Sequence, residues 1–199
     1  MTTLTIVFDT KYGQTQKIAE YAAELARDRG HMVQLVRPSA EDPATFGNAL
    51  IVLSPVFAGK HMESIRRFAQ SHHALLTARP SAFFSVSGSA ASKFPAERAR
   101  IMGLAEAFVA STSWRPRFIA TLGGAIAYPR YNFFLRFMMK RITKKQGGPT
   151  DTSRTHELTD WVAVERAVDR LLTELDAKDA ESKGASFAPQ GGSSATAWG

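Results

Sequence analysis

Hydrophobic positions along the chain follow two alternating patterns. Short continuous apolar runs, bounded by polar residues, are typical of strands that are buried on both faces of a parallel sheet. Between them, apolar residues recur every three or four positions, which predicts amphipathic helices. The strands are predicted at residues 4–8, 32–36, 49–53, 81–86 and 118–124, and helices at 14–29, 65–76, 95–108 and 161–175. This alternation predicts an α/β fold with a doubly wound parallel sheet of five strands.

The loop after the first strand has the composition of a phosphate site. It reads Thr10-Lys11-Tyr12-Gly13-Gln14-Thr15 and leads directly into a helix. Helix N-termini attract anions, glycine permits a close approach of the backbone, and threonine hydroxyls donate hydrogen bonds. The spacing matches neither the dinucleotide fingerprint nor the Lys-Ser/Thr nucleotide loop. The alternative is an ordinary turn whose threonines only cap the helix.

Two further loops are expected to meet this one. In doubly wound sheets, ligands bind at the carboxyl ends of the strands, where the strand order reverses. The loops there are Pro55-Val56-Phe57-Ala58-Gly59 after the third strand and Ser85-Val86-Ser87-Gly88-Ser89 at the end of the fourth. His61 is the best-placed candidate for a general base, although a single loop histidine is more often a polar surface residue.

Residues 126–158 form an insertion between the fifth strand and the last helix, because they exceed an ordinary connection. Residues 131–145 predict a helix that combines many apolar residues with five cations and no acid. This basic amphipathic composition favours a helix that lies on an anionic membrane surface through residues 130–145. The alternative is a core-packed helix with a solvated basic end. Nucleic-acid binding is not expected, since no recognition motif accompanies the cations.

Charge and composition exclude several kinds of site and location for this chain. The chain has 199 residues and a net charge of +7, and nine basic residues against one acid lie between Arg115 and Arg154. The absence of cysteine excludes disulfides and thiolate metal sites, and we predict no metal. Neither a secretory signal nor an apolar run of roughly 20 residues is found. We expect one domain at residues 1–175, a flexible tail at 176–199, and a cytosolic or membrane-surface location.

Motifs spread over roughly residues 3–175 resemble those of one flavoprotein family, the menaquinone-dependent protoporphyrinogen IX oxidases of the flavodoxin superfamily. They are the loop at residues 10–15, then Pro80-Ser81-Ala82-Phe83-Phe84-Ser85-Val86, Ser113-Trp114-Arg115-Pro116, Tyr128-Pro129-Arg130-Tyr131, Arg136-Phe137-Met138, Gly147-Gly148 with Thr150-Asp151-Thr152, and Thr159-Asp160-Trp161. Two features depart from the family pattern. Asp9 stands where Ser is common, and the loop after the third strand is altered.

The resemblance implies a flavodoxin-like sheet of order 2-1-3-4-5 that binds FMN through residues 10–15, 55–59 and 85–89. It also implies the oxidation of protoporphyrinogen IX, a step of haem biosynthesis, with menaquinone or ubiquinone as acceptor, on the cytoplasmic face of the cell membrane. Arg130 or Arg136 could pair with a propionate of this substrate. Together with His61, these arginines are the candidate catalytic residues.

Other functions remain open at this point. An NAD(P)H-linked flavin quinone reductase would share the FMN site, and a small electron-transfer flavodoxin would lack a substrate of its own. A membrane-surface protein that has lost the flavin is a third alternative. The sequence also leaves a homo-oligomer open.

Overall fold

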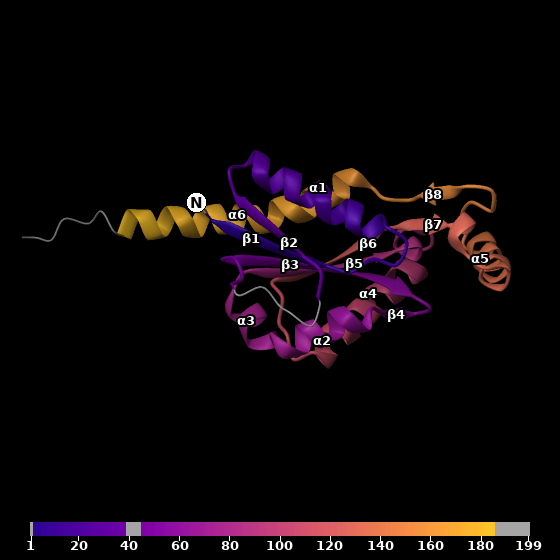
Figure 1. Ribbon diagram of the computed structural model, residues 1–199, viewed down its shortest axis with the longest axis horizontal. Coiled ribbons are helices and arrows are strands. Elements are labelled where there is room, and N and C mark those ends of the chain that lie inside the picture. Colours follow the sequence, from indigo (N-terminus) through magenta and orange to yellow (C-terminus); the bar gives the residue numbers. More distant parts are fainter. Residues whose placement is uncertain (1, 39–44, 186–199) are drawn as a thin grey trace, which may run out of the picture.

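Five parallel strands form the centre of the molecule. The computed structural model describes residues 2–38 and 45–185. The strands lie in the order β2-β1-β3-β5-β6 (Figure 1). Their bounds are β1 Thr3–Phe8, β2 Met32–Val36, β3 Ala49–Phe57, β5 Ser81–Ser87 and β6 Phe118–Gly123. Counted among the parallel strands alone, this is the predicted order 2-1-3-4-5, so the flavodoxin-like sheet is confirmed.

Helices cover both faces of the sheet, because successive strand residues point to opposite sides. α1 and α6 pack on the face that carries Leu4, Ile6 and Ile51. α2, α3 and α4 pack on the face that carries Val7 and Val52 (Figure 1). The helices span α1 Gln14–Asp28, α2 Glu63–Ser71, α3 His73–Ala78, α4 Pro95–Ser111 and α6 Trp161–Ala185. Burial on both sides explains why the central strands β1, β3 and β5 read as nearly continuous apolar runs.

The parallel register brings three loops to the same edge of the sheet. β1 and β5 each pair with β3, and Val86 near the end of β5 lies opposite Pro55. Beyond this edge, β3 turns through Ala58 and Gly59, which have φ angles of 49° and 76°, into the short antiparallel strand β4 (Lys60–His61). A 3-10 helix, η1 (Gly88–Ala91), follows β5.

The insertion predicted at residues 126–158 carries a helix on a two-stranded stem. β7 (Ala125–Ala127) pairs antiparallel with β8 (Thr155–Glu157), and between them lie the 3-10 helix η2 (Tyr128–Arg130) and α5 (Phe133–Lys145). The helix was predictable, whereas strands of this length show no detectable periodicity. The stem closes the insertion at its base, so α5 lies beyond one end of the main sheet (Figure 1).

The last helix continues past the predicted domain boundary. α6 runs to Ala185, whereas the sequence predicts a tail that starts at residue 176. Residues 176–185 lack an apolar stripe, but they are rich in Ala, Glu, Lys and Asp. Three of these residue types favour helix, which explains how it continues without such a stripe. The remainder of the predicted tail, residues 186–199, lies outside the described residues.

Candidate functional site

The loop after β1 prepares the start of α1 for an anion. Gly13 is the N-cap residue with a φ of 97°, and its N–H donates to the Thr10 hydroxyl at 2.9 Å. Among the described residues, no side chain caps the first turn of α1. Its N–H groups therefore stay available at the positive end of the helix dipole. This is the local geometry that a phosphate group requires.

A cavity of about 240 Å³ lies where this loop meets the other two loops and the insertion. The predicted residues that line it are Thr10, Lys11, Tyr12, Gln14, Thr15, Pro55, Val56, Phe57, Ala58, Gly59, Val86, Ser87, Gly88 and Ser89. Of the residues predicted to bind the cofactor, Gly13 and Ser85 lie outside this lining. Gly13 acts through its backbone conformation, and the Ser85 side chain is buried beside His61. The structure thus brings three separate stretches together, and their binding of a cofactor stays a prediction.

Aromatic contacts join the phosphate loop to the insertion. The ring centroid of Tyr12 lies 6.0 Å from that of Phe57 and 5.0 Å from that of Tyr131. Lys11 Nζ lies 3.4 Å from the centre of the Phe57 ring, a cation–π contact. The Arg130 guanidinium donates to the Tyr12 carbonyl at 2.9 Å. The insertion is therefore attached to the loop on which a phosphate would bind.

Asp9, which departs from the family pattern, is surrounded by donors. One carboxylate oxygen accepts a hydrogen bond from the Ser64 hydroxyl at 2.5 Å. The other accepts from the Thr10 N–H at 2.7 Å and lies 3.4 Å from a nitrogen of Arg37. These contacts offset the negative charge of the Asp9 carboxylate, and Asp9 does not belong to the cavity lining. The extra negative charge is therefore compatible with a phosphate nearby.

His61 is not part of the cavity lining. Its Nε2 is 2.9 Å from the Ser85 hydroxyl, and its ring packs against Phe83 and Phe108 with centroid distances of 5.2 and 4.7 Å. Burial lowers the pKa of His61 to about 4, so the ring is neutral at pH 7. Strand β4 directs this residue toward α4, a placement that its position next to the loop did not reveal. The geometry does not support His61 as a general base.

Arg136 holds the turn that precedes α5. Its Nε donates to the Tyr128 carbonyl at 3.1 Å, and a terminal nitrogen donates to the Tyr131 carbonyl at 3.2 Å. Neither Arg130 nor Arg136 is part of the cavity lining. Both arginines bind backbone carbonyls, so the geometry favours positioning of the insertion over contact with a substrate.

Several lining residues were missing from the sequence-based site. They are Arg100 and Ile101 of α4, Gly124, Ala125 and Ile126 around β7, Tyr131, the α5 residues Leu135, Met138, Met139, Ile142 and Thr143, and Gln146. For α5, the surplus of apolar residues around the helix was a usable signal, since one of its faces lines the cavity. For Arg100 no local signal exists, because it resembles any exposed arginine of an amphipathic helix.

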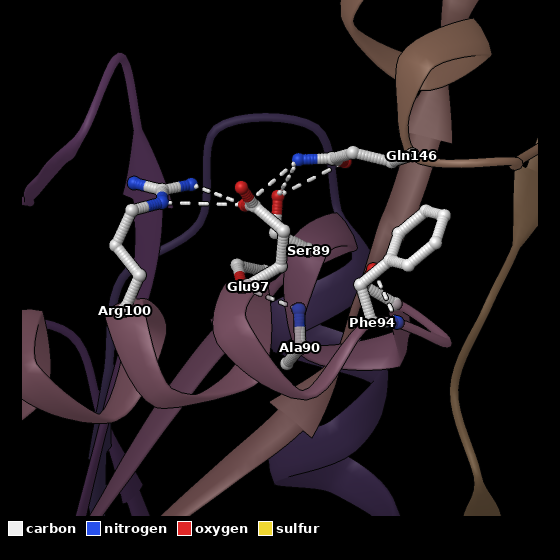
Figure 2. Close-up of polar contacts among 8 residues, drawn as sticks. Ser89, Ala90, Phe94, Glu97, Arg100 and Gln146 are labelled. Carbon is white, nitrogen blue, oxygen red and sulfur yellow. Dashed lines mark hydrogen bonds and ion pairs between the residues drawn. The ribbon is translucent and has the colours of Figure 1, made fainter.

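Gln146 ties the C-terminal end of α5 to the main domain, as Figure 2 shows. Its Nε2 donates to the Ser89 hydroxyl and to Glu97 Oε2, at 3.1 Å in each case. The same Glu97 oxygen lies 3.0 Å from a terminal nitrogen of Arg100. α5 is thus attached at its start by Arg130 and at its end by Gln146.

Comparison with known proteins finds a matching family profile and similar relatives. A family profile described as a flavodoxin domain matches residues 5–153. The chain is 32% identical over 162 residues to protoporphyrinogen IX dehydrogenase (quinone) of Escherichia coli strain K12, over 80% of this chain and 88% of that protein. The Leishmania major protein of the same name is 32% identical over 165 residues, which cover 81% of this chain and 71% of that protein. Among solved structures, oxidised flavodoxin 1 of Bacillus cereus has a TM-score of 0.46 at 13% identity, over 61% of this chain and 84% of that chain.

Proposed function

Because the chain belongs to the flavodoxin-domain family and to the family of protoporphyrinogen IX dehydrogenases (quinone), we propose that it oxidises protoporphyrinogen IX to protoporphyrin IX, with a quinone as electron acceptor. One observation of the structure supports this proposal in addition to the family membership. The cavity combines a helix start suited to a phosphate with an apolar wall from α5. A cofactor phosphate and an apolar macrocycle could therefore occupy adjoining parts of one site.

The flavin implied by the flavodoxin domain is proposed to be FMN. The residues of the phosphate loop fit the phosphate of this cofactor, because Gly13 has a positive φ and the first turn of α1 has no side-chain cap within the described part of the chain. Residues 10–15 would hold the phosphate, and residues 55–59 and 86–89 would contact the ring. Bound there, FMN would supply the capacity to accept and release electrons.

The protein's own contribution is binding, orientation and exclusion of water. Leu135, Met138, Met139 and Ile142 of α5 would cover the apolar body of the substrate. Methionine adapts its shape readily, which suits a large flexible macrocycle. Because these residues line one side of the cavity, they would also exclude water from a bound substrate. None of these roles requires a general base at His61.

An electron-donor comparison tests this function. Purified protein loaded with FMN is given protoporphyrinogen IX and a soluble quinone, and formation of protoporphyrin IX is followed by its fluorescence. Under anaerobic conditions, which remove dissolved oxygen as a competing oxidant, we expect fluorescence to rise only with protein and quinone both present. A protein that instead reduces quinone with NADH and leaves protoporphyrinogen IX unchanged would be a quinone reductase. A protein that retains FMN and catalyses neither reaction would be an electron-transfer flavodoxin.

The outward face of α5 is proposed to contact an anionic membrane. Phe133, Phe134 and Phe137 are 88%, 75% and 62% exposed, which argues against a helix packed wholly in the core. The cations of the same helix that are exposed are Lys140, Arg141, Lys144 and Lys145. Exposed aromatic rings followed by cations suit the boundary between lipid headgroups and acyl chains. In the described part of the chain, no helix is long and apolar enough to cross a bilayer.

Vesicle binding tests this contact. The protein is sedimented with vesicles that contain anionic phosphatidylglycerol or only neutral phosphatidylcholine. We expect the wild type to be retained on the anionic vesicles. Changing the three phenylalanines to serine should reduce this retention at least about tenfold, since each ring would bury a large apolar area in the membrane. Val162→Ser is the matched control, because Val162 is 56% exposed on a different helix. Equal retention of the wild type and the triple variant on anionic vesicles would contradict the proposal. It would also be contradicted if the wild type formed a dimer and did not bind vesicles, and the triple variant were a monomer, because the phenylalanines would then form a protein interface.

A further inference from the structure

Two cations lie among the described residues that line the cavity, Lys11 and Arg100. Lys11 belongs to the phosphate loop and rests on the Phe57 ring. Arg100 comes from α4 and shares the cavity with the apolar residues of α5. The part of the cavity beside α5 therefore combines an apolar wall with a guanidinium group.

Arg100 is held by a weak and replaceable partner. Its Nε and a terminal nitrogen approach the same oxygen of Glu97, at 3.2 and 3.0 Å, so the pair does not use the two-oxygen fork that arginine and carboxylate prefer. The side chains of Arg100 and Glu97 are 51% and 31% exposed. Pairs with this exposure add little to stability, because water screens them. A second carboxylate could displace Glu97 at small cost.

We propose that Arg100 binds a carboxylate of the substrate and thereby selects anionic tetrapyrroles over neutral ones. This inference rests on the proposed function, because protoporphyrinogen IX is an apolar ring that carries two propionates. The ring would lie against α5, and one propionate would receive two parallel hydrogen bonds from the guanidinium group. Glu97 would keep its hydrogen bond from Gln146, so α5 would remain tied while Arg100 changes partner.

The alternative anchors named by the sequence are less suitable. The Arg130 guanidinium is bonded to the Tyr12 carbonyl, and the Arg136 guanidinium is bonded to carbonyls around η2. Neither arginine lines the cavity, and Arg136 would also have to break contacts that hold the insertion in place. Arg100 needs to break only its contact with Glu97, which is why the geometry points to this residue.

Binding of a diacid and of its neutral ester separates the charge from the apolar contact. FMN-loaded protein is titrated with protoporphyrin IX and with protoporphyrin IX dimethyl ester in the same detergent, by porphyrin fluorescence. We expect the wild type to bind the diacid more tightly. Arg100→Gln should weaken binding of the diacid by about threefold to tenfold, because water partly screens a pair made by a half-exposed guanidinium group, and leave the ester within about twofold. Arg100→Lys should restore part of the loss, since it keeps the charge without the fork.

Two further readouts guard against a merely structural effect. Arg98→Gln is the matched control, because Arg98 is exposed on the same helix but does not line the cavity. The KM for quinone, which carries no carboxylate, should stay unchanged in Arg100→Gln. A preference for the diacid that persists in Arg100→Gln would overturn this inference and leave the proposed function intact. A wild-type protein that binds neither porphyrin would overturn the proposed function as well.

Discussion

Removal of the Gln146 side chain tests how firmly α5 is held over the cavity. Gln146→Ala deletes both hydrogen bonds that Nε2 donates, to Ser89 and to Glu97 (Figure 2). The contacts at the other end of α5, including the Arg130 hydrogen bond to Tyr12, are not touched by this change. We therefore expect local opening of α5 and little change in the main sheet.

The size of the effect follows from the two bonds. A bond between neutral groups contributes about 1 kcal/mol, and a bond to an ionised group contributes about 1.5 to 3 kcal/mol. Partial exposure of Glu97 reduces the second value. A total of about 2 kcal/mol is reasonable, and this corresponds to roughly a thirtyfold increase in the opening equilibrium.

Hydrogen exchange measures this opening directly. We expect amides in the last turns of α5 to exchange about tenfold to thirtyfold faster in Gln146→Ala, while amides of β3 and β5 keep their protection. Gln16→Ala is the matched control, because Gln16 donates a single exposed bond to Glu20 on α1 at 2.8 Å. Unchanged protection of α5 would show that Gln146 does not hold the helix. Faster exchange throughout the sheet would show that its role is in global stability.

Three other substitutions test the site. Gly13→Ala should destabilise the protein by about 1 to 2 kcal/mol and weaken FMN binding, because its φ of 97° strains any residue with a Cβ, even though the new Cβ would lie 3.8 Å from the nearest atom, on Arg130. Gly103→Ala in α4 is the control and should leave FMN binding unchanged, since a Cβ there meets no atom within 4 Å. Equal FMN affinities of Gly13→Ala and the wild type would refute this reasoning. His61→Phe should reduce the acid sensitivity of folding. The pKa of His61 is about 4 in the folded protein and about 6.5 in the unfolded chain. Between these two pH values the unfolded chain binds a proton that the folded protein does not, so folding stability is lost as the pH falls from 6.5 to 4. Urea unfolding at pH 7.5 and 4.5 should show a loss larger by about 2 to 3 kcal/mol in the wild type than in the variant, and equal losses would contradict the burial of His61. Arg130→Gln should raise the Kd for FMN about fivefold through loss of the 2.9 Å bond to Tyr12, and an unchanged titration would show that this bond does not support the loop.

The main sheet was predictable because its central strands, β1, β3 and β5, are buried on both faces. Such strands are apolar along most of their length, and this pattern is visible without any structure. One boundary was missed. The sequence predicts that the third strand ends at residue 53, yet β3 continues to Phe57. Proline usually ends a strand, but the pairing of Pro55 with Val86 and the antiparallel partner β4 extend this one.

The insertion shows where periodicity stops being informative. Its helix was predictable from a run without a helix-breaking residue, but its stem strands are only three residues each. The surplus of apolar residues in α5 also had two causes that the sequence does not separate. Met139 lines the cavity, whereas Phe133 is exposed to solvent.

The sequence by itself predicted the order of the main strands and helices, the glycine-containing loop between the first strand and helix at residues 10–15, and the resemblance to a flavoprotein family, because each depends on neighbours along the chain. Only the tertiary structure decided which distant side chains share the cavity. Arg100 and one face of α5 line it, whereas His61 is half-buried against Phe83 and Phe108 and Arg136 binds the backbone. The physical reason is that a side chain's direction depends on the strand or helix that carries it and on how these elements pack, which local periodicity does not encode.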